Sequence, residues 1–233
     1  MSYAAPTPPD EKKETKPETV SLFLGDYSTS RNVSQPTGLT SKIYWLVVKD
    51  SEDMFRVKSM NEQNLPAGIS RKLPVDEFMH IFAPEPDHFV EYTLPTLKLY
   101  LDENKDKVEV LDQMLEIGFT TSKNESTSEA IDRITKHLSE RSKHLKIDQS
   151  RELSRYSVKL RKEKRYETAI EYCRKAINLN KADENIYFNM SRVYFEMDEK
   201  NMAMKCILYA IKLNESFEQA LKFKQYMERN IIS

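Results

Sequence analysis

The sequence predicts a mainly α-helical protein in which helix-turn-helix repeats stack into an α-solenoid behind a small N-terminal α+β region. Three observations support this fold class. The last third of the chain repeats itself every 34 residues, residues 43–58 are rich in β-branched and aromatic side chains, and no apolar run reaches eighteen residues. A fixed period of this length is typical of helical hairpins that bury their apolar faces against one another.

The N-terminal region is expected to contain a tail and a small folded leader. Residues 1–20 are rich in Pro, Lys and Glu and offer almost nothing to bury, so we expect a disordered tail. Residues 21–119 then form the leader. Within it, residues 43–48 and 54–58 flank a polar turn and predict a β-hairpin.

Helices are predicted after this hairpin. Pro74 opens a short helix in which Phe78, Ile81 and Phe82 share one face, and we expect this helix to cap the hairpin. Residues 107–117 predict a further helix that Gly118 closes. The best candidate for a linker is residues 120–127, which are followed by a helical domain over 128–233.

The 34-residue period is visible at several positions of that domain. The residues that share a register are Leu153, Tyr187 and Leu221; Ser157 and Ser191; Leu160 and Tyr194; Ala169 and Ala203; and Ala176 and Ala210. Small side chains at helix crossings let two axes approach to about 8–10 Å, which explains the recurring Ala. Upstream, residues 128–147 predict one more helix, either the second helix of a degenerate earlier repeat or an addition that completes the core.

These positions resemble the tetratricopeptide repeat, whose pattern has a large apolar residue, a small residue, an aromatic residue and two Ala. The resemblance implies repeats at residues 150–183 and 184–217 and a capping helix at 218–231. The departures are Lys181 and Glu215 where the family ends each unit with Pro, and Asp198 in place of the usual turn Gly.

The leader carries a second resemblance. Tyr44-Trp45, residues 65–68, Glu77-Phe78 and residues 84–86 are similar to the leader of certain bacterial tetratricopeptide proteins of unestablished activity. This resemblance extends over most of the chain but brings no catalytic residues with it.

The family resemblance implies a protein–protein interaction scaffold or adaptor, because the first helix of each repeat lines a groove that binds a peptide or helix of a partner. The groove positions are Arg151, Ser154, Arg155, Val158, Arg161 and Lys162 in the first repeat, and Asn185, Phe188, Asn189, Arg192, Phe195 and Glu196 in the second. Arg and aromatic residues are typical of binding hot spots and suit an acidic, apolar peptide. Alternatively, Phe188 and Phe195 pack on upstream helices and fill the groove from within.

Two other functions are compatible with the sequence. One is a chaperone for a subunit of a secretion or surface apparatus, although the long leader argues against it. The other is weak binding of an anionic ligand or nucleic acid through residues 136–165, which hold eleven Lys or Arg against four Asp or Glu. There Tyr156 and His144 would be available to stack on bases. A solvated face or a surface for an acidic protein explains the same excess.

Enzymatic function is not expected. The four Gly are scattered, so the chain lacks a phosphate-binding or dinucleotide-binding loop, and we expect no cofactor or metal. His80 with Glu77 and Asp87 is the sole candidate for acid–base chemistry in the leader. Cys173 and Cys206 lie in predicted helices as small core residues, which suits a reducing compartment and a cytoplasmic location.

Overall fold

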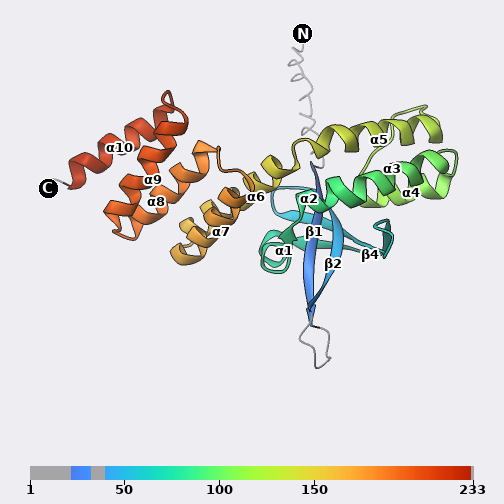
Figure 1. The fold of residues 1–233 in the computed structure, drawn as a ribbon, viewed down its shortest axis with the longest axis horizontal. Helices are drawn as coiled ribbons and strands as arrows, with labels where there is room; N and C mark the ends of the chain where they lie inside the picture. Colours follow the sequence, from blue (N-terminus) through green and yellow to red (C-terminus); the bar gives the residue numbers. More distant parts are fainter. Residues whose placement is uncertain (1–21, 33–39, 232–233) are drawn as a thin grey trace, which may run out of the picture.

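The computed structural model describes residues 22–32 and 40–231, and it places an antiparallel sheet before a series of helices (Figure 1). The tail expected over residues 1–20 lies outside the described residues. The prediction of helical repeats behind a sheet-containing region is confirmed at this level. No helix in the described ranges is long and apolar enough to cross a membrane.

The sheet is antiparallel throughout, with strand order β4-β3-β2-β1-β5. Its strands are β1 (Leu22–Asn32), β2 (Thr40–Lys49), β3 (Met54–Met60), β4 (Pro66–Pro74) and β5 (Ala83–Pro84). The predicted hairpin is β2–β3, in which Trp45 lies opposite Ser59. The sequence does not predict β1 and β4, whose polar residues and Gly weaken the alternating pattern of a strand, or β5, which has only two residues, one of them Pro.

One face of the sheet is covered by α1 (Val75–Ile81), the short helix expected after Pro74. The Phe78 ring is fully buried and stacks on Phe55 of β3 at 4.0 Å between centroids, as a cap on the hairpin requires. The prediction that Ile81 shares the buried face is wrong, because its side chain is 50% exposed while Met79 is buried.

The opposite face packs against a second group of helices. They are α2 (Pro86–His88), the π-helix η1 (Phe89–Thr93), α3 (Leu94–Glu103), α4 (Val108–Ile117) and α5 (Thr127–Ser142). Their apolar residues form one cluster with Phe23, Leu46 and Val48 of the sheet. Gly118 ends α4 with φ of 121°, as the predicted C-cap.

The connection between α4 and α5 is held by Arg133, which pairs with Glu125 at 2.8 Å. Ser126 and Glu129 close the start of α5 as a reciprocal capping box. The expected single helix over residues 128–147 is wrong, because a turn at Lys143 and His144 separates α5 from the next helix. The division of the chain at residues 120–127 stays a prediction.

The C-terminal part consists of helical hairpins. Its helices are α6 (Leu145–Lys162), α7 (Tyr166–Leu179), α8 (Glu184–Glu196), α9 (Lys200–Leu213) and α10 (Glu218–Ile231). The four Ala of the repeat register are fully buried. The turns are equivalent too, since Lys164 and Asp198, 34 residues apart, both have positive φ near 60°. Asp adopts this conformation more readily than most residues, so the missing turn Gly is tolerated.

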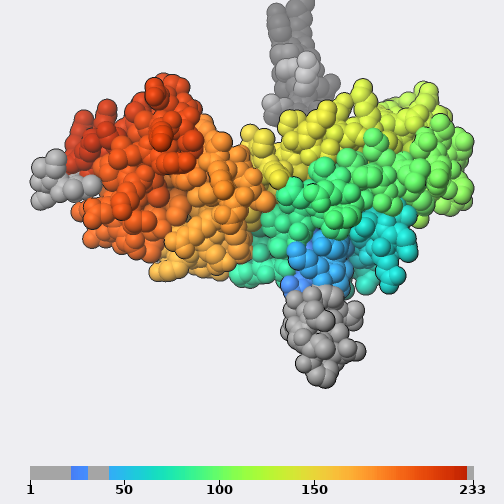
Figure 2. All heavy atoms as spheres, in the orientation of Figure 1, coloured from blue at the N-terminus to red at the C-terminus, as the bar shows by residue number. Residues whose placement is uncertain are grey.

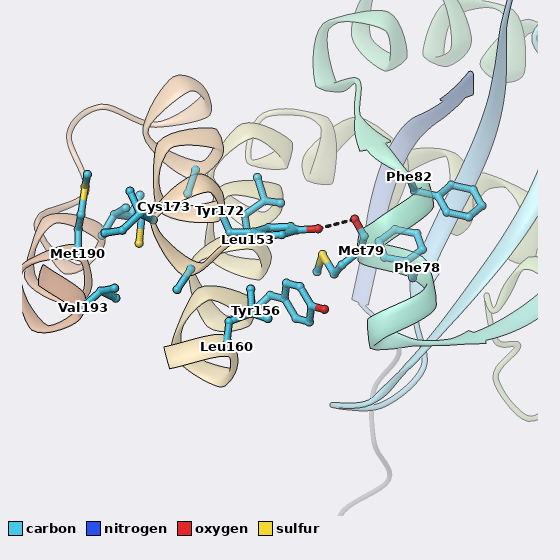
Figure 3. Packing of buried hydrophobic residues seen from close by; sticks show 14 of the residues in the cluster. Phe78, Met79, Phe82, Leu153, Tyr156, Leu160, Tyr172, Cys173, Met190 and Val193 are labelled. Carbon is cyan, nitrogen blue, oxygen red and sulfur yellow. Dashed lines mark hydrogen bonds between the residues drawn. The ribbon is translucent and has the colours of Figure 1, made fainter. Parts of the chain in front are cut away.

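Helix α6 joins the two parts. Its N-terminal half lies on the sheet, where Gln149 Nε2 donates to Leu24 O at 2.7 Å, and its C-terminal half pairs with α7. Tyr156 and Tyr172 face α1, and the Tyr172 hydroxyl donates to Met79 O at 2.7 Å (Figure 3). In the space-filling view the repeat helices therefore lie directly against the leader (Figure 2).

Candidate functional site

A hollow of about 320 Å³ lies between α6 and α8, the first helices of the two repeats. Its lining residues are Arg151, Ser154, Arg155, Val158, Asp183, Asn185 and Asn189. Six of these seven are positions that the repeat register predicts to face the groove. The structure therefore brings together the polar residues predicted in the N-terminal halves of both helices.

Hydrogen bonds fix the amide groups of this hollow. Asn189 Nδ2 donates to Ser154 Oγ at 3.1 Å and so links α8 to α6. The Asp183 side chain caps α8 by accepting from the Asn185 backbone N–H at 3.0 Å. The cap determines where α8 begins and therefore where Asn185 stands. Asp183 was not predicted as a site residue, although an Asp directly before an apolar helical pattern is a recognisable N-cap.

The rim of the hollow is basic. The side chains of Arg151 and Arg155 are 59% and 65% exposed. Each lies near an acid on the preceding turn of α6: an Arg151 nitrogen is 3.9 Å from Asp148, and Arg155 pairs with Glu152. Both arginine side chains are largely exposed, so an incoming carboxylate can reach their guanidinium groups.

The far end of the predicted groove has a different character. Arg161 is buried and pairs with Glu196 of α8, so its guanidinium serves an internal contact, whereas Lys162 is exposed. Arg192 lies 5.8 Å from the centre of the Phe188 ring. Burial and the neighbouring Arg161 charge both lower the pKa of Arg192. The guanidinium groups of Arg161 and Arg192 therefore lie near a single carboxylate, that of Glu196, and this end of the groove keeps a positive charge.

The two groove phenylalanines are half-buried in an aromatic cluster. Phe188 lies 5.3 Å from Phe217 and 6.0 Å from Phe223, while Phe195 lies 5.5 Å from Phe223 and 5.7 Å from Tyr226. Their aromatic partners are thus in α10 and the turn before it, on the C-terminal side of α8, rather than in the helices upstream. The spacing of Phe223 and Tyr226 in α10 was the signal that could have placed them beside the groove.

The acid–base candidates of the leader do not assemble. His80 and Glu77 are exposed, and Asp87 pairs with Lys146 of α6 at 2.8 Å. Among the residues that the structure describes, no group of three or more His, Cys, Asp or Glu is arranged to hold a metal ion.

A histidine that the sequence analysis passed over has the more ordered surroundings. His88 Nδ1 lies 2.6 Å from Oδ2 of the fully buried Asp26, and Thr93 Oγ1 donates to the same oxygen at 2.5 Å. The His88 ring stacks on Tyr44 with centroids 3.5 Å apart. Desolvation raises the pKa of Asp26, and the hydrogen bonds from His88 and Thr93 oppose that rise. This network fastens η1 to β1.

The basic strip over residues 136–165 is largely neutralised. Of its eleven Lys and Arg, seven form ion pairs within the described part of the chain, including pairs with Asp76, Asp87 and Glu196 from outside the strip. Tyr156 is 2% exposed, so the expectation that it is available to stack on bases is wrong: its ring packs against Tyr172 in the core.

Comparison with known families agrees with the repeat register. The tetratricopeptide repeat family matches residues 160–183 and 184–217. No curated protein has a matching sequence. The predicted recognition of the C-terminal part is therefore confirmed, and the second matched unit has the bounds that the 34-residue period gave.

Proposed function

We propose that this chain is a scaffold or adaptor whose tetratricopeptide repeats, stacked as a short α-solenoid and capped by α10, bind a peptide or helix of another protein. The observation that carries the proposal is the hollow between α6 and α8, because six of its seven lining residues are groove positions of the repeat. Proteins that contain this repeat commonly bind other proteins, so a hollow at these positions supports a binding role.

The chemistry of the groove favours a partner segment that is acidic and apolar. Arg151 and Arg155 supply exposed guanidinium groups, which bind carboxylates through paired N–H donors. Asn185 and Asn189 supply amides for the backbone of an extended chain. Next to them, the half-buried rings of Phe188 and Phe195 offer apolar contact area with Arg192 beside it.

The groove is tested with the double variant Arg151→Glu/Asn185→Ala, because both side chains are exposed and their replacement spares the core. Phe188 is a poorer test, since it packs on Phe217 and Phe223 and its loss would also affect folding. We expect affinity capture from a native lysate, followed by mass spectrometry, to recover a protein that the double variant loses. Reversing the charge of Arg151 should repel an acidic partner.

The matched control is Lys205→Glu/Asn201→Ala on α9, where the same kinds of exposed residue are changed away from the groove. This control should retain the captured protein, and binding should weaken as salt is raised. Capture of an identical set of proteins by wild type, control and groove variant would rule out the groove.

The other functions receive less support. Nucleic-acid binding through residues 136–165 is disfavoured because most of those cations already have acidic partners. A chaperone role would use the same groove, and no feature of the described residues favours it over an adaptor. A cytoplasmic location stays part of the proposal, and the two free thiols at Cys173 and Cys206 are compatible with it.

A further inference from the structure

A second hollow, of about 530 Å³, lies where the leader meets the first repeat. It opens between the β2–β3 turn, α1 and α6. We call it the junction hollow; its lining residues are Lys49, Glu52, Asp53, Val75, Met79, Glu152, Arg155, Tyr156, Lys159 and Lys162. Half of these come from the leader, so the register of the repeats does not predict the hollow.

The junction hollow adjoins the repeat groove across α6. Arg155 lines both hollows, so its side chain stands on the ridge of α6 that separates them. The two hollows therefore lie on either side of one helix, and an extended chain that leaves the repeat groove over Arg155 arrives in the junction hollow.

The two sides of the junction hollow carry opposite charge. Its helix side presents Arg155, Lys159 and Lys162 from α6, and its turn side presents Glu52 and Asp53. Glu52, Asp53 and Lys162 are exposed and form no ion pair within the described ranges. A ligand can therefore pair with these three charges without displacing an existing ion pair.

The remaining lining residues are less open to new partners. Glu152 pairs with Lys49 at 2.5 Å, with side chains 4% and 11% exposed, and also with Arg155, while Lys159 pairs with Asp76 at 2.7 Å. Val75, Met79 and the ring of Tyr156 supply apolar surface below them. The hollow thus has a base of apolar and ion-paired residues between a basic side and an acidic side.

We propose that the junction hollow binds the continuation of the segment held in the repeat groove, with that segment's acidic residues along α6 and a Lys or Arg against Glu52 and Asp53. This inference rests on the proposed function of the repeats. Charge complementarity of this kind selects the partner and determines its register, because a segment bound in the wrong register would place charges of the same sign next to each other. The leader then takes part in recognition and sets the orientation of the bound segment.

The test uses three fluorescein-labelled synthetic peptides of equal length and composition, built from Asp, Glu, Leu and Phe with one Lys-Lys pair. The three peptides differ only in the position of the Lys-Lys pair, which is at the N-terminal end, at the centre or at the C-terminal end. In fluorescence anisotropy titrations of the full chain, we expect one end-charged peptide to bind about three- to ten-fold more tightly than the centre-charged one, as two exposed ion pairs allow.

The variant Glu52→Gln/Asp53→Asn should abolish that preference while leaving the affinity for the centre-charged peptide unchanged. Its matched control is Asp102→Asn/Glu103→Gln, another exposed pair of adjacent acids, at the end of α3. The control should keep the preference.

Different results would contradict the proposal for the junction hollow and the proposal for the repeat groove. Equal binding of the three peptides, or a preference that survives Glu52→Gln/Asp53→Asn, overturns the junction site and leaves the groove standing. Loss of all three peptides in Arg151→Glu/Asn185→Ala supports the groove by itself. Absence of binding by any peptide to the wild type at about 1 mM, a free energy near −4 kcal/mol, overturns both.

Discussion

At the scale of single residues, burial decides what a polar side chain can do. Asp26 looks in the sequence like one more polar residue among Gly25, Ser28 and Thr29, yet it is fully buried and accepts from Thr93 and lies against His88. Its second oxygen, Oδ1, has no hydrogen-bond partner within the described residues. A carboxylate in such surroundings is costly to keep charged.

Asp26 should therefore destabilise the fold as it ionises. Because desolvation raises its pKa above the ordinary 3.8, the folded state holds this proton more tightly than the unfolded state. The stabilisation of the folded state by protonated Asp26 is complete below pH 3.8 and is lost as the pH rises through the higher folded pKa. We expect the free energy of unfolding of wild type, minus that of Asp26→Asn, to fall as the pH rises from about 3.5 to 7.

Urea unfolding at several pH values measures this difference. Asp112→Asn is the control, because it makes the same chemical change at an exposed position on α4 and leaves the buried pair of Asp26 and His88 intact. A difference for Asp26→Asn that rises with pH would mean that the His88 charge outweighs desolvation and lowers the pKa of Asp26.

At the scale of elements, α6 is the decisive helix. The repeat register predicted α6 only from residue 150 onward, whereas the helix begins at Leu145, which rests on β1 at Gly25. Gly25 has φ of +74°, and a Cβ there would lie 2.7 Å from Leu145 Cδ1 at the start of α6. The register of β1 against β2 also shifts between Phe23 and Gly25, so this bulge provides the space that α6 needs.

Gly25→Ala should therefore loosen the contact between sheet and α6. The strained φ and the clash with Leu145 together predict a loss of about 2–4 kcal/mol in the free energy of unfolding. Urea unfolding of Gly25→Ala, Leu145→Ala and the double variant forms a cycle in which the double variant should cost less than the two single changes added. Additive costs would show that the two residues do not clash.

At the scale of the whole molecule, the leader and the first repeat share one hydrophobic cluster. It runs from Phe78 in the leader to Leu153 and Tyr172 in the repeat (Figure 3). Tyr27 and Phe55 of the sheet belong to the same cluster. Two clear repeats are fewer than such arrays usually need for stability. The leader therefore supplies the surface that an additional repeat would otherwise provide.

The leader and the repeats should consequently unfold in one transition. Trp45, the single Trp of the sequence, reports on the sheet through its fluorescence, and circular dichroism at 222 nm reports chiefly on the helices. We expect the two urea unfolding curves to share one midpoint. Separate midpoints, with the Trp45 transition apart from the loss of helix, would show that the repeats fold without the leader.

The sequence by itself determined the repeats, their 34-residue register, the β2–β3 hairpin and six of the seven residues that line the hollow between α6 and α8. These features depend on neighbours in the chain or on a period within it, so their signals are local. Arg151, Asn185 and Asn189 could be assigned to the groove from the register alone.

Only the tertiary structure decided the other strands, the Asp26–His88 pair, the aromatic contacts of Phe188 and the junction hollow. Each depends on residues far apart in sequence, as in the hydrogen bond from Gln149 to Leu24 across 125 positions. Such contacts satisfy backbone groups and bury side chains whose own sequence neighbourhoods are ordinary, so they leave no local pattern to recognise.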